Sequence, residues 1–436
     1  MSALAVGSVL CWLRSREEEA KGKQKWQAAS LVLFLLSALV KETGLTVAAL
    51  VAVHAFVNPK QEGSSRREKA GEAGRAALPF LALAVVYLLV RRAVLGGVVQ
   101  PEWPGPVTVL LTLPAVLLFY ARQLAWPVGL SAFYDLRLVT AAGLQSFWIP
   151  LLMVAVAGAA LTFWARKSRA AALGVGWLMI PLLPALAGVA LFEPSELVHD
   201  RYLYLPVAGF AVLLAMGVRR LRPGGAALFG LPATQVAVVI VLAVAWGAAT
   251  ARESAHWASN LLLFTRGVEV APGNVLAHDN LANEMYKRGR PEVAINLYLR
   301  ALELDPKHWT SHFALGLTYL DVGQFAEADR HMEMASAIRP GNANQYYFQG
   351  LARIRAGRWR EAEAPLRKAV ELWPRGPGYH YLLGMALLET GRREEAREQF
   401  EAELKMYPGS PARERLAEME RAPKEIRKLP PDKRAE

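Results

Sequence analysis

Apolar runs fill most of the first 250 residues and constrain this chain more than any other feature. They cover about residues 3–13, 27–40, 44–57, 78–95, 106–125, 147–165, 172–192, 202–218 and 233–250. A membrane-crossing helix needs about 20 apolar residues, within a range of about 17–25, and the last six runs reach that length. Lipid offers the backbone no hydrogen-bond partner, so helices are the expected form. Residues 1–252 are therefore predicted to be a polytopic transmembrane helix bundle.

Composition supports a chain made of an apolar half and a polar half. Hydrophobic residues make up 53% of the chain and charged residues 20%, with a formal net charge of +12. Cys11 is the only cysteine, so a disulfide framework and a paired-cysteine metal site are excluded. The excess of basic residues is expected in cytoplasmic loops, which excludes nucleic acid as the predicted partner.

Orientation follows from the basic residues of the short loops, since Lys and Arg accumulate on the cytoplasmic side. Segments 14–25, 58–77, 166–171 and 219–223 are rich in Lys and Arg and are predicted to be cytoplasmic. Residues 126–146, 193–201 and everything after 250 then lie outside. Segment 58–77 is predicted inside and 126–146 outside, so an odd number of membrane crossings must join them, yet two apolar runs lie between them. Either 106–125, with Pro114 in its middle, enters without crossing, which we favour, or 27–57 crosses only once.

The beginning of the chain lacks the features of a targeting signal. No basic residue precedes the apolar run 3–13, and Leu10 before Cys11 fits a lipoprotein cleavage site poorly. The run has the character of the end of a helix whose start is missing. We therefore expect the chain to be truncated at its N-terminus.

The second half carries a repeat of 34 residues. Prolines recur at that spacing at Pro272, Pro306, Pro340, Pro374 and Pro408. This is the period of the tetratricopeptide repeat, a helix–turn–helix unit that stacks into a solenoid, with the proline ending the second helix. Small residues recur where two helices approach, at Ala294, Ala328, Ala362 and Ala396 and at Ala282, Gly316, Gly350 and Gly384. The prediction is an all-α chain whose residues 253–421 hold a half repeat (255–271), four repeats and a cap (411–421), followed by a disordered charged tail at 422–436.

The first helix of each repeat is expected to line a concave groove. Aromatic and apolar residues recur there at Phe313, Leu317, Tyr347, Leu351, Tyr381 and Met385. They indicate either a groove for an extended peptide or acceptor protein, or packing between neighbouring helices. His278, His312 and His380 share a repeat position but lie one repeat apart, so no metal site is predicted from them.

The most polar stretch at an outer helix end is 192–206. It gathers Glu193, Glu196, His199, Asp200 and Arg201, followed by Tyr202 and Tyr204. An Arg at head-group depth suits a lipid-linked phosphate through bidentate hydrogen bonds. The alternative is an interfacial anchor, in which Arg201 extends to the head groups beside a tyrosine belt. Tyr134-Asp135 and, at the end of another run, Arg91-Arg92 with Tyr87 add polar groups.

Three short motifs carry a resemblance to a known family. Lys41-Glu42-Thr43-Gly44, Asp200-Arg201-Tyr202-Leu203-Tyr204-Leu205-Pro206 and the link His256-Trp257 with Asn260 and Leu263-Phe264 resemble elements of C-type multi-span glycosyltransferases with tetratricopeptide repeats. Their relatives are the transmembrane and tetratricopeptide-repeat protein O-mannosyltransferases. The resemblance covers about residues 1–410.

The resemblance implies a membrane enzyme that takes a sugar from a polyprenyl-phosphate carrier and transfers it to a protein hydroxyl outside the cytosol. It implies supporting roles for Lys41, Glu42, Arg201, Tyr202 and Tyr204, and also for Arg91 and Asp135. The acidic catalytic residues of that family lie in a first outer loop that has no counterpart in this sequence. No catalytic residue is therefore assigned, and a chain that is inactive as this fragment stays an alternative. Membrane lipid, polyprenyl phosphate and an acceptor protein are the expected partners.

High Ala, Leu and Arg content favours a bacterial inner membrane, with the repeats in the periplasm. Two other functions stay open. One is a membrane-anchored repeat scaffold without chemistry, and the other is a ligase or polymerase of surface polysaccharide. A need for a divalent metal, the sugar, the acceptor and the oligomeric state are not determined by the sequence.

Overall fold

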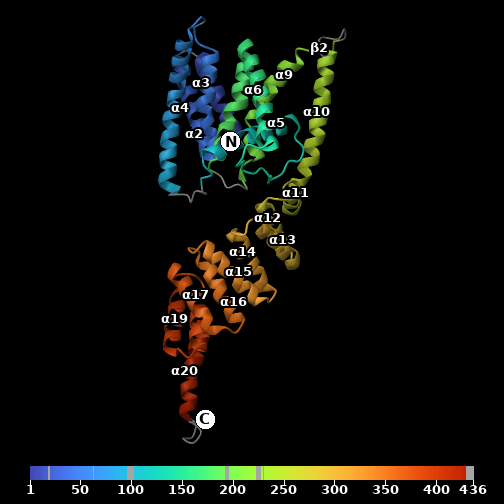
Figure 1. Ribbon diagram of the computed structural model, residues 1–436. Coiled ribbons are helices and arrows are strands. Elements are labelled where there is room, and N and C mark those ends of the chain that lie inside the picture. Colours follow the sequence, from blue (N-terminus) through green and yellow to red (C-terminus); the bar gives the residue numbers. More distant parts are fainter. Residues whose placement is uncertain are drawn as a thin grey trace. The chain divides into compact units, whose positions relative to one another are not determined.

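The computed structural model describes residues 1–17, 20–61, 63–95, 103–191, 196–221, 227–228 and 230–428. It divides into two compact units, Met1–Ala271 and Pro272–Glu436. Helices make up nearly all of the described secondary structure, with one two-stranded hairpin of β1 (Ala227–Leu228) and β2 (Leu231–Pro232) (Figure 1). The all-α fold class predicted from the sequence is confirmed.

The first unit holds eleven α-helices among its described residues. They are α1 (Ser2–Glu17), α2 (Ala20–Val40), α3 (Val47–Val57), α4 (Arg66–Leu95), α5 (Pro106–Ala125), α6 (Ile149–Lys167), α7 (Arg169–Met179), α8 (Leu183–Gly188), α9 (Pro206–Val218) and α10 (Ala233–Ser254), with α11 (Asn260–Val270) closing the unit. Among the described residues, five helical stretches are long and apolar enough to cross a membrane: Arg66–Val94, Pro106–Ala125, Leu144–Lys167, Arg169–Gly188 and Ala233–Trp257. The chain is an integral membrane protein.

The sequence expectation of a full span at 202–218 is wrong. Helix α9 begins only at Pro206 and has 13 residues, while the residues before it form the short 3₁₀ turn η5 (Asp200–Leu203). Proline favours the first turn of a helix, because its missing N–H would be unpaired there anyway. The polar residues of the turn therefore lie ahead of the helix, at its N-terminal end.

Helices α1 to α4 pack around one apolar core. Ser8 on α1 and Ser30 on α2 each donate a hydrogen bond to the other's carbonyl oxygen, at 2.8 and 2.7 Å. Phe34 and Phe80 meet edge to face with their ring centroids 5.4 Å apart. The run 27–57 forms two helices rather than one, since the 3₁₀ turn η1 (Glu42–Thr46) separates α2 from α3.

Helix α5 packs on segments that join other helices. The Thr112 hydroxyl accepts a hydrogen bond from the Val139 N–H at 2.9 Å. Eight residues further along the helix, the Tyr120 hydroxyl accepts one from the His199 N–H at 3.3 Å. Its neighbours also include α8, η5 and the π-type turn η2 (Leu144–Trp148) that begins α6. Its 20 residues are long and apolar enough to cross a membrane, so entry without crossing stays a prediction.

A buried carboxylate holds the end of α10 to the rest of the first unit. Glu253 is 2% exposed and accepts hydrogen bonds from the N–H groups of Gly129 and Leu130 at 3.3 and 3.1 Å. Arg266 on α11 forms an ion pair with it at 3.3 Å. The division between the units therefore falls after Ala271, later than the boundary at 252 expected from the sequence, because 253–271 contacts the loop after α5.

The second unit is an array of antiparallel helix pairs. The pairs are α12 (Val275–Lys287) with α13 (Pro291–Leu304), α14 (Trp309–Asp321) with α15 (Phe325–Ile338), α16 (Ala343–Arg355) with α17 (Trp359–Leu372), and α18 (Tyr379–Glu389) with α19 (Arg393–Met406). A last helix, α20 (Ala412–Lys428), packs on α19. It runs past the predicted cap at 411–421, so residues 422–428 are helical rather than part of a disordered tail, and 429–436 lie outside the described residues.

Two kinds of small residue fix the geometry of each repeat. Gly289, Gly323, Gly357 and Gly391 stand 34 residues apart in the turn between the paired helices, with φ between 71° and 83°. Only glycine adopts such angles without strain. Gly350 lies where α16 meets α17, and a Cβ there would come within 2.5 Å of Leu366 Cγ. The close approach of the two helices thus depends on the small residues that recur in the sequence.

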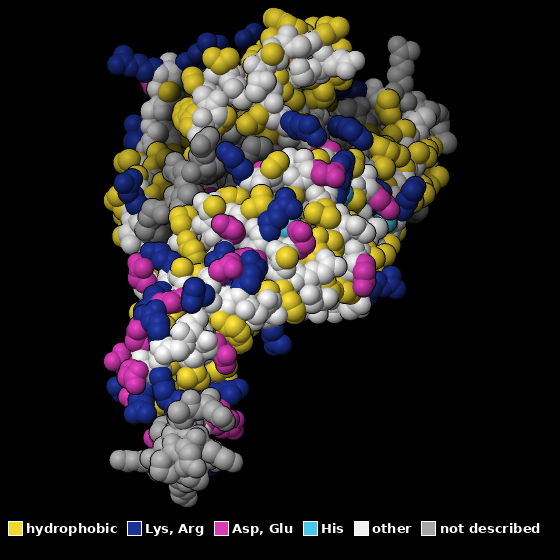
Figure 2. Space-filling model, turned by 60° about the horizontal axis from the view of Figure 1, so that its bottom comes forward, with side chains coloured by type: hydrophobic (Ala, Val, Ile, Leu, Met, Phe, Trp, Pro, Cys, Tyr) yellow, Lys and Arg dark blue, Asp and Glu magenta, His cyan; other side chains and the backbone are white. Residues whose placement is uncertain are grey.

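Charges on the repeat unit alternate in sign over its surface (Figure 2). Several form ion pairs between neighbouring helices, such as Arg353 and Arg358 with Asp329, both at 2.8 Å. Arg392 and Arg367 share Glu363 and Glu395 in the same way. The exposed pairs among them, such as Arg367 with Glu395, contribute little singly, whereas Asp329 is buried and its pairs with Arg353 and Arg358 join neighbouring repeats.

Candidate functional site

Two short turns of the first unit carry the residues that the sequence singles out. Lys41 ends α2 and leads into η1, while Arg201 and Tyr202 lie in η5, which is followed by α9. Gly44 allows the first turn to fold back on α2, because a Cβ there would lie 2.6 Å from the Ser37 carbonyl carbon. The site is therefore built where helices of the first unit end.

Lys41, Arg201 and Tyr202 form the centre of the site. The Lys41 Nζ lies 4.6 Å from the centroid of the Tyr202 ring, and the Arg201 Cζ lies 5.9 Å from the same centroid. Tyr202 is 6% exposed, so its ring is a fixed surface for both cations. Cations near an aromatic face gain from its quadrupole, by about 0.5–1 kcal/mol where exposed and more where water is excluded.

Glu42 and Arg91 form an ion pair beside this centre. The pair joins η1 to α4, and Arg91 also donates to the Tyr87 hydroxyl at 3.2 Å, one turn earlier on α4. Because Arg91 takes up the Glu42 carboxylate, neither Lys41 nor Arg201 forms an ion pair with another residue of the described ranges. Within the described ranges, these two cations thus lie together without a carboxylate bound to either.

Burial, followed by the neighbouring cations, shifts the pKa of two groups in the site. Burial, and then the nearby Arg201, lower the pKa of Lys41 to about 8. Burial together with Arg201 and Lys41 lowers the pKa of His199 to about 4. Both shifts disfavour a further positive charge, so a bound anion would stabilise the site.

A second layer of hydrogen bonds holds η5 in place. The Tyr134 hydroxyl donates to Asp200 Oδ2 at 2.6 Å and accepts from the Ser131 N–H at 2.9 Å. Burial raises the pKa of Asp200 to about 6. The other carboxylate oxygen of Asp200, Oδ1, is buried and has no hydrogen-bond partner among the described residues. Asp200 therefore faces the Tyr134 loop, and Arg201 and Tyr202 are the residues of η5 that meet Lys41.

The structure separates two of the predicted site residues from this cluster. Tyr204 is 66% exposed, whereas Tyr202, two residues earlier, is 6% exposed and lies beside Lys41. Asp135 lines a different cavity of about 750 Å³, together with Arg122 and Arg137. Glu193 lies outside the described residues. Five residues, Lys41, Glu42, Arg91, Arg201 and Tyr202, come from three parts of the chain and meet.

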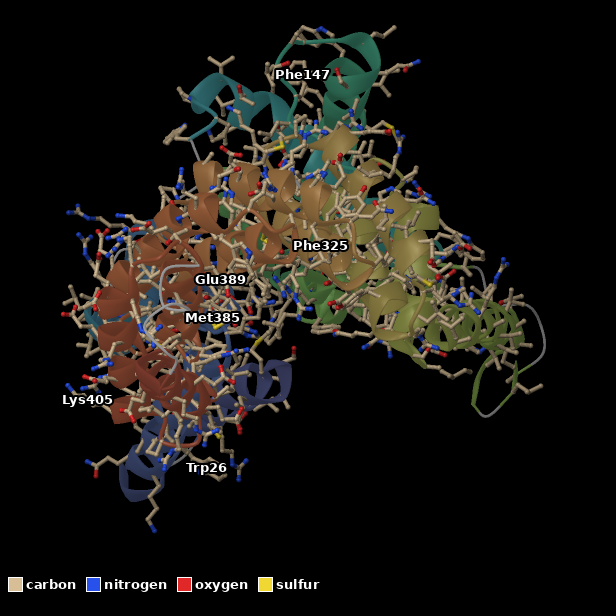
Figure 3. All side chains as sticks on the ribbon, turned by 90° about the horizontal axis from the view of Figure 1, so that it is seen from below. Trp26, Phe147, Phe325, Met385, Glu389 and Lys405 are labelled. Carbon is tan, nitrogen blue, oxygen red and sulfur yellow. The ribbon has the colours of Figure 1, made fainter. Side chains whose placement is uncertain are left out.

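In the repeat unit the six predicted groove residues all lie on first helices and are half-buried. Aromatic rings connect neighbouring repeats: Phe313 meets Phe348 with centroids 5.9 Å apart, and Tyr347 stacks on Tyr379 at 4.8 Å. Met385 lies one turn before Glu389 on α18 (Figure 3). The rings thus contact one another between repeats while each keeps part of its surface open, and the groove remains a prediction.

The recurring histidines have a local role in the repeat. Each places Nε2 close to the carbonyl oxygen of the proline six residues earlier, at 2.9 Å for His278 and 3.0 Å for His312 and His380. The bond joins the start of the first helix to the turn that precedes it. Within the described ranges, no group of three His, Cys, Asp or Glu side chains is arranged to hold a metal ion.

Sequence reasoning missed two groups that shape the site. Tyr120 is completely buried in the middle of α5, and its hydroxyl reaches His199 across about 80 residues of sequence. Glu253 fixes the loop that carries Tyr134. Glu253 could have been noticed in the sequence, because it is a carboxylate just after the apolar run 233–250. Tyr120 lies inside an apolar run, and no feature of its neighbouring residues distinguishes it.

Comparison with protein families identifies the second unit. The families described as "TPR repeat" and "Tetratricopeptide repeat" match residues 282–323 and 347–411. Among solved structures, YrrB, described as a TPR protein with an unusual peptide-binding site, is 28% identical over 34% of this chain and 75% of its own, with a TM-score of 0.32. The predicted tetratricopeptide repeats are confirmed, and such repeats are typical of protein–protein interaction.

Curated relatives extend the similarity beyond the repeats. Protein O-mannosyl-transferase Tmtc3 of Drosophila melanogaster is 27% identical over 173 residues, which cover 40% of this chain and 18% of the relative. Protein O-mannosyl-transferase TMTC1 of Mus musculus is 27% identical over 231 residues, covering 51% of this chain and 24% of the relative. The matches thus span about a fifth to a quarter of these relatives. The chain is a membrane protein with tetratricopeptide repeats that resembles the protein O-mannosyl-transferases.

Proposed function

We propose that this chain acts in the transfer of a sugar from a polyprenyl-phosphate carrier to a protein hydroxyl. In this proposal the Lys41–Arg201–Tyr202 centre binds the phosphate of the carrier. The names of the similar proteins support the reaction class. The geometry supports the site, because two cations share one aromatic surface and no carboxylate of the described residues forms an ion pair with either.

The chemistry of the three side chains suits a lipid-linked phosphate. A guanidinium binds phosphate oxygens in a bidentate way, and an ammonium adds a compact charge from another direction. The Glu42–Arg91 pair joins the turn that follows Lys41 to α4 and engages the Glu42 carboxylate. The single observation that carries the proposal is the convergence of Lys41 and Arg201 on Tyr202 at the end of α2.

The location of the site fits a reaction outside the cytoplasm. Lys23 and Lys41 lie near opposite ends of α2, and the first belongs to a loop that the charge rule assigns to the cytoplasm. The site then faces the periplasm of a bacterial inner membrane. The repeats lie on that side as well, because α10 separates them from the basic segment 219–223.

The repeats would present the acceptor protein. Half-buried aromatic rings on first helices, such as Phe313, Tyr347 and Tyr381, offer apolar surface at the spacing of one repeat. An extended segment that contains the acceptor hydroxyl would bind along them. The same surface serves the alternative function, a membrane-anchored scaffold that binds partner proteins without chemistry.

The test uses the full chain in membranes supplied with polyprenyl-phosphate mannose and an acceptor protein. Transfer by the wild-type chain should fall at least tenfold in Arg201→Ala, whereas Arg219→Ala, which removes an equal charge from a predicted cytoplasmic loop, should keep it. Equal transfer by Arg201→Ala and wild type would remove Arg201 from the site. A wild-type chain that binds proteins through its repeats and transfers no sugar would overturn the transferase proposal in favour of the scaffold.

A further inference from the structure

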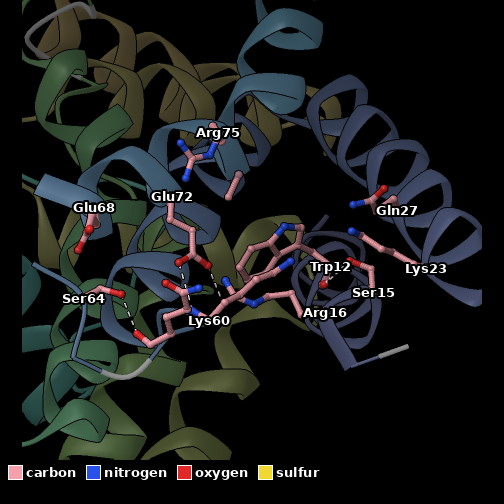
Figure 4. Close-up of a pocket in the computed structure, with 12 residues that line it drawn as sticks. Trp12, Ser15, Arg16, Lys23, Gln27, Lys60, Ser64, Glu68, Glu72 and Arg75 are labelled. Atoms are coloured by element: carbon pink, nitrogen blue, oxygen red, sulfur yellow. Dashed lines mark hydrogen bonds and ion pairs between the residues drawn. The ribbon is translucent and has the colours of Figure 1, made fainter. Parts of the chain in front are cut away.

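A polar pocket lies at the other end of the same helices. It has a volume of about 470 Å³ and is lined by α1, α2, α4 and the loop before α4 (Figure 4). Lys23 and Arg75 lie on different sides of the open space, with Trp12 and Arg16 at its base. A water molecule occupies about 30 Å³ in the liquid, so the pocket is many times larger than one water. It therefore has room for a phosphate with its attached polar group.

The carboxylates of the pocket are already bound by other groups. Glu72 forms an ion pair with Arg16 at 2.9 Å and accepts a hydrogen bond from the Lys60 N–H at 3.1 Å. Glu68 accepts one from the Ser65 N–H at 2.7 Å. Among the described residues, Lys23, Arg75 and the Lys60 ammonium take part in no ion pair. In the part of the chain that the structure describes, three cations without an ion-pair partner therefore line a pocket whose Glu68 and Glu72 carboxylates are bound by other groups.

The pocket lies at the depth of the lipid head groups. Each of its three helices changes from polar to apolar beside it: α1 between Leu13 and Arg14, α2 after Lys25, and α4 between Arg75 and Ala76. Trp26, 39% exposed, stands at this boundary, as aromatic residues do at membrane interfaces. Three independent helices thus place the edge of the hydrocarbon at the same pocket.

The distance to the Lys41 centre agrees with the thickness of a bilayer. Lys23 and Lys41 are 18 residues apart on and just after α2, which at about 1.5 Å per residue is roughly 27 Å. On α4, no charged residue lies between Arg75 and Arg91. A hydrocarbon core is about 30 Å thick, so the two cationic sites occupy opposite membrane surfaces.

We propose that this pocket binds the phosphate of an anionic phospholipid from the leaflet opposite the Lys41 centre. The free cations supply charge-assisted hydrogen bonds to the phosphate, while the apolar faces of α1, α2 and α4 below the pocket contact the acyl chains. Leu78 and Leu81, both at least half exposed on α4, provide such a face. The site is independent of the transfer reaction, because its residues lie at the far end of the helices from Arg201.

The experiment measures lipid retention by the purified full chain in detergent with native mass spectrometry. Dioleoylphosphatidylglycerol and dioleoylphosphatidylcholine are added in separate samples, and sodium phosphate is added to a third sample that already contains the phosphatidylglycerol. The pocket variant is Lys23→Gln/Arg75→Gln. Its control is Lys25→Gln/Arg67→Gln, which removes two charges from the same two helices, α2 and α4, at residues that do not line the pocket.

Wild type and control should retain phosphatidylglycerol at least fivefold better than phosphatidylcholine, and the pocket variant should lose this preference. The Lys60→Gln variant alone should weaken retention less than the double variant, with helix content unchanged by circular dichroism. Equal retention by pocket and control variants would overturn the proposal, as would equal retention of the two lipids by wild type. Displacement of the lipid by millimolar phosphate would assign the pocket to a soluble phosphate instead.

Discussion

Replacing Gly209 with alanine tests the tightest helix contact of the membrane unit. Gly209 lies on α9 against α7, and an added Cβ would stand 2.3 Å from the Leu178 N and 2.4 Å from the Gly174 carbonyl oxygen. Both are backbone atoms, so no side chain can turn away to make room. Small residues have this role at helix contacts in lipid, where close backbone approach replaces the hydrophobic effect as the source of attraction.

The cost follows from the displacement that the new methyl group requires. An ordinary contact for a Cβ is 3.4–4 Å, so α7 and α9 must separate by roughly 1 Å. Overpacking of this kind costs about 1–3 kcal/mol. Gly→Ala within an open helix gains about 0.8–1 kcal/mol. The difference between Gly209→Ala and the same change in an open helix is therefore expected to be about 2–4 kcal/mol.

The matched controls are Gly158→Ala on α6 and Gly247→Ala on α10, since a Cβ at either position meets nothing within 4 Å. Unfolding in mixed micelles with increasing SDS, followed by far-ultraviolet circular dichroism, ranks the variants. Both controls should equal or exceed the wild type, and Gly209→Ala should unfold at lower SDS. A Gly209→Ala protein as stable as the two controls would refute the close contact of α7 and α9.

Three further outcomes are expected. Gly350→Ala should destabilise α16 and α17 by about 1–2 kcal/mol, since its Cβ would lie 2.5 Å from Leu366 Cγ; Leu366→Ala should relieve the clash in a double-mutant cycle on hydrogen exchange of the full chain, and purely additive effects would argue against it. Burial, and then His312, lower the pKa of His331 to about 4, so the unfolded chain binds more protons there and the repeats should lose stability as the pH falls from about 6.5 to about 4. Hydrogen exchange should show a flatter pH dependence in His331→Phe, and an unchanged slope would exclude this histidine as its source. Because the pKa of Lys41 is lowered to about 8, donor binding should weaken as the pH rises from 7 to 9 and the ammonium is lost, whereas Lys41→Arg should bind independently of pH in this range; a wild type without pH dependence would contradict the role of Lys41.

Much of the fold is written in periodic features of the sequence. The prolines from Pro272 to Pro408 predict the repeats, and the apolar runs predict the membrane helices, because each pattern reports a local requirement that holds along the chain. The ends of the helices are predicted less well from the sequence. The start of α9 at Pro206 and the end of α20 at Lys428 differ from the expected bounds, since apolarity and charge measure solvent preference rather than hydrogen bonding.

The candidate site was predicted in its parts. Short motifs named Lys41, Arg201 and Tyr202, yet no spacing in the sequence indicates that a residue before α3 meets residues before α9. Nor could the sequence distinguish Arg201, which joins the centre, from Tyr204, which is 66% exposed only three residues later. The direction of a side chain in a 3₁₀ turn depends on what the turn packs against.

The sequence by itself determined which half of the chain lies in the membrane and which in water, because this follows from composition. It also determined the helical repeat, from its period, and the residue types able to bind a phosphate. The tertiary structure decided which cations meet. Glu42 pairs with Arg91 of α4, and Lys41 and Arg201 both lie near the ring of Tyr202. These contacts join residues far apart in the sequence, up to about 160 positions for Lys41 and Tyr202, and only the packing of the helices sets them.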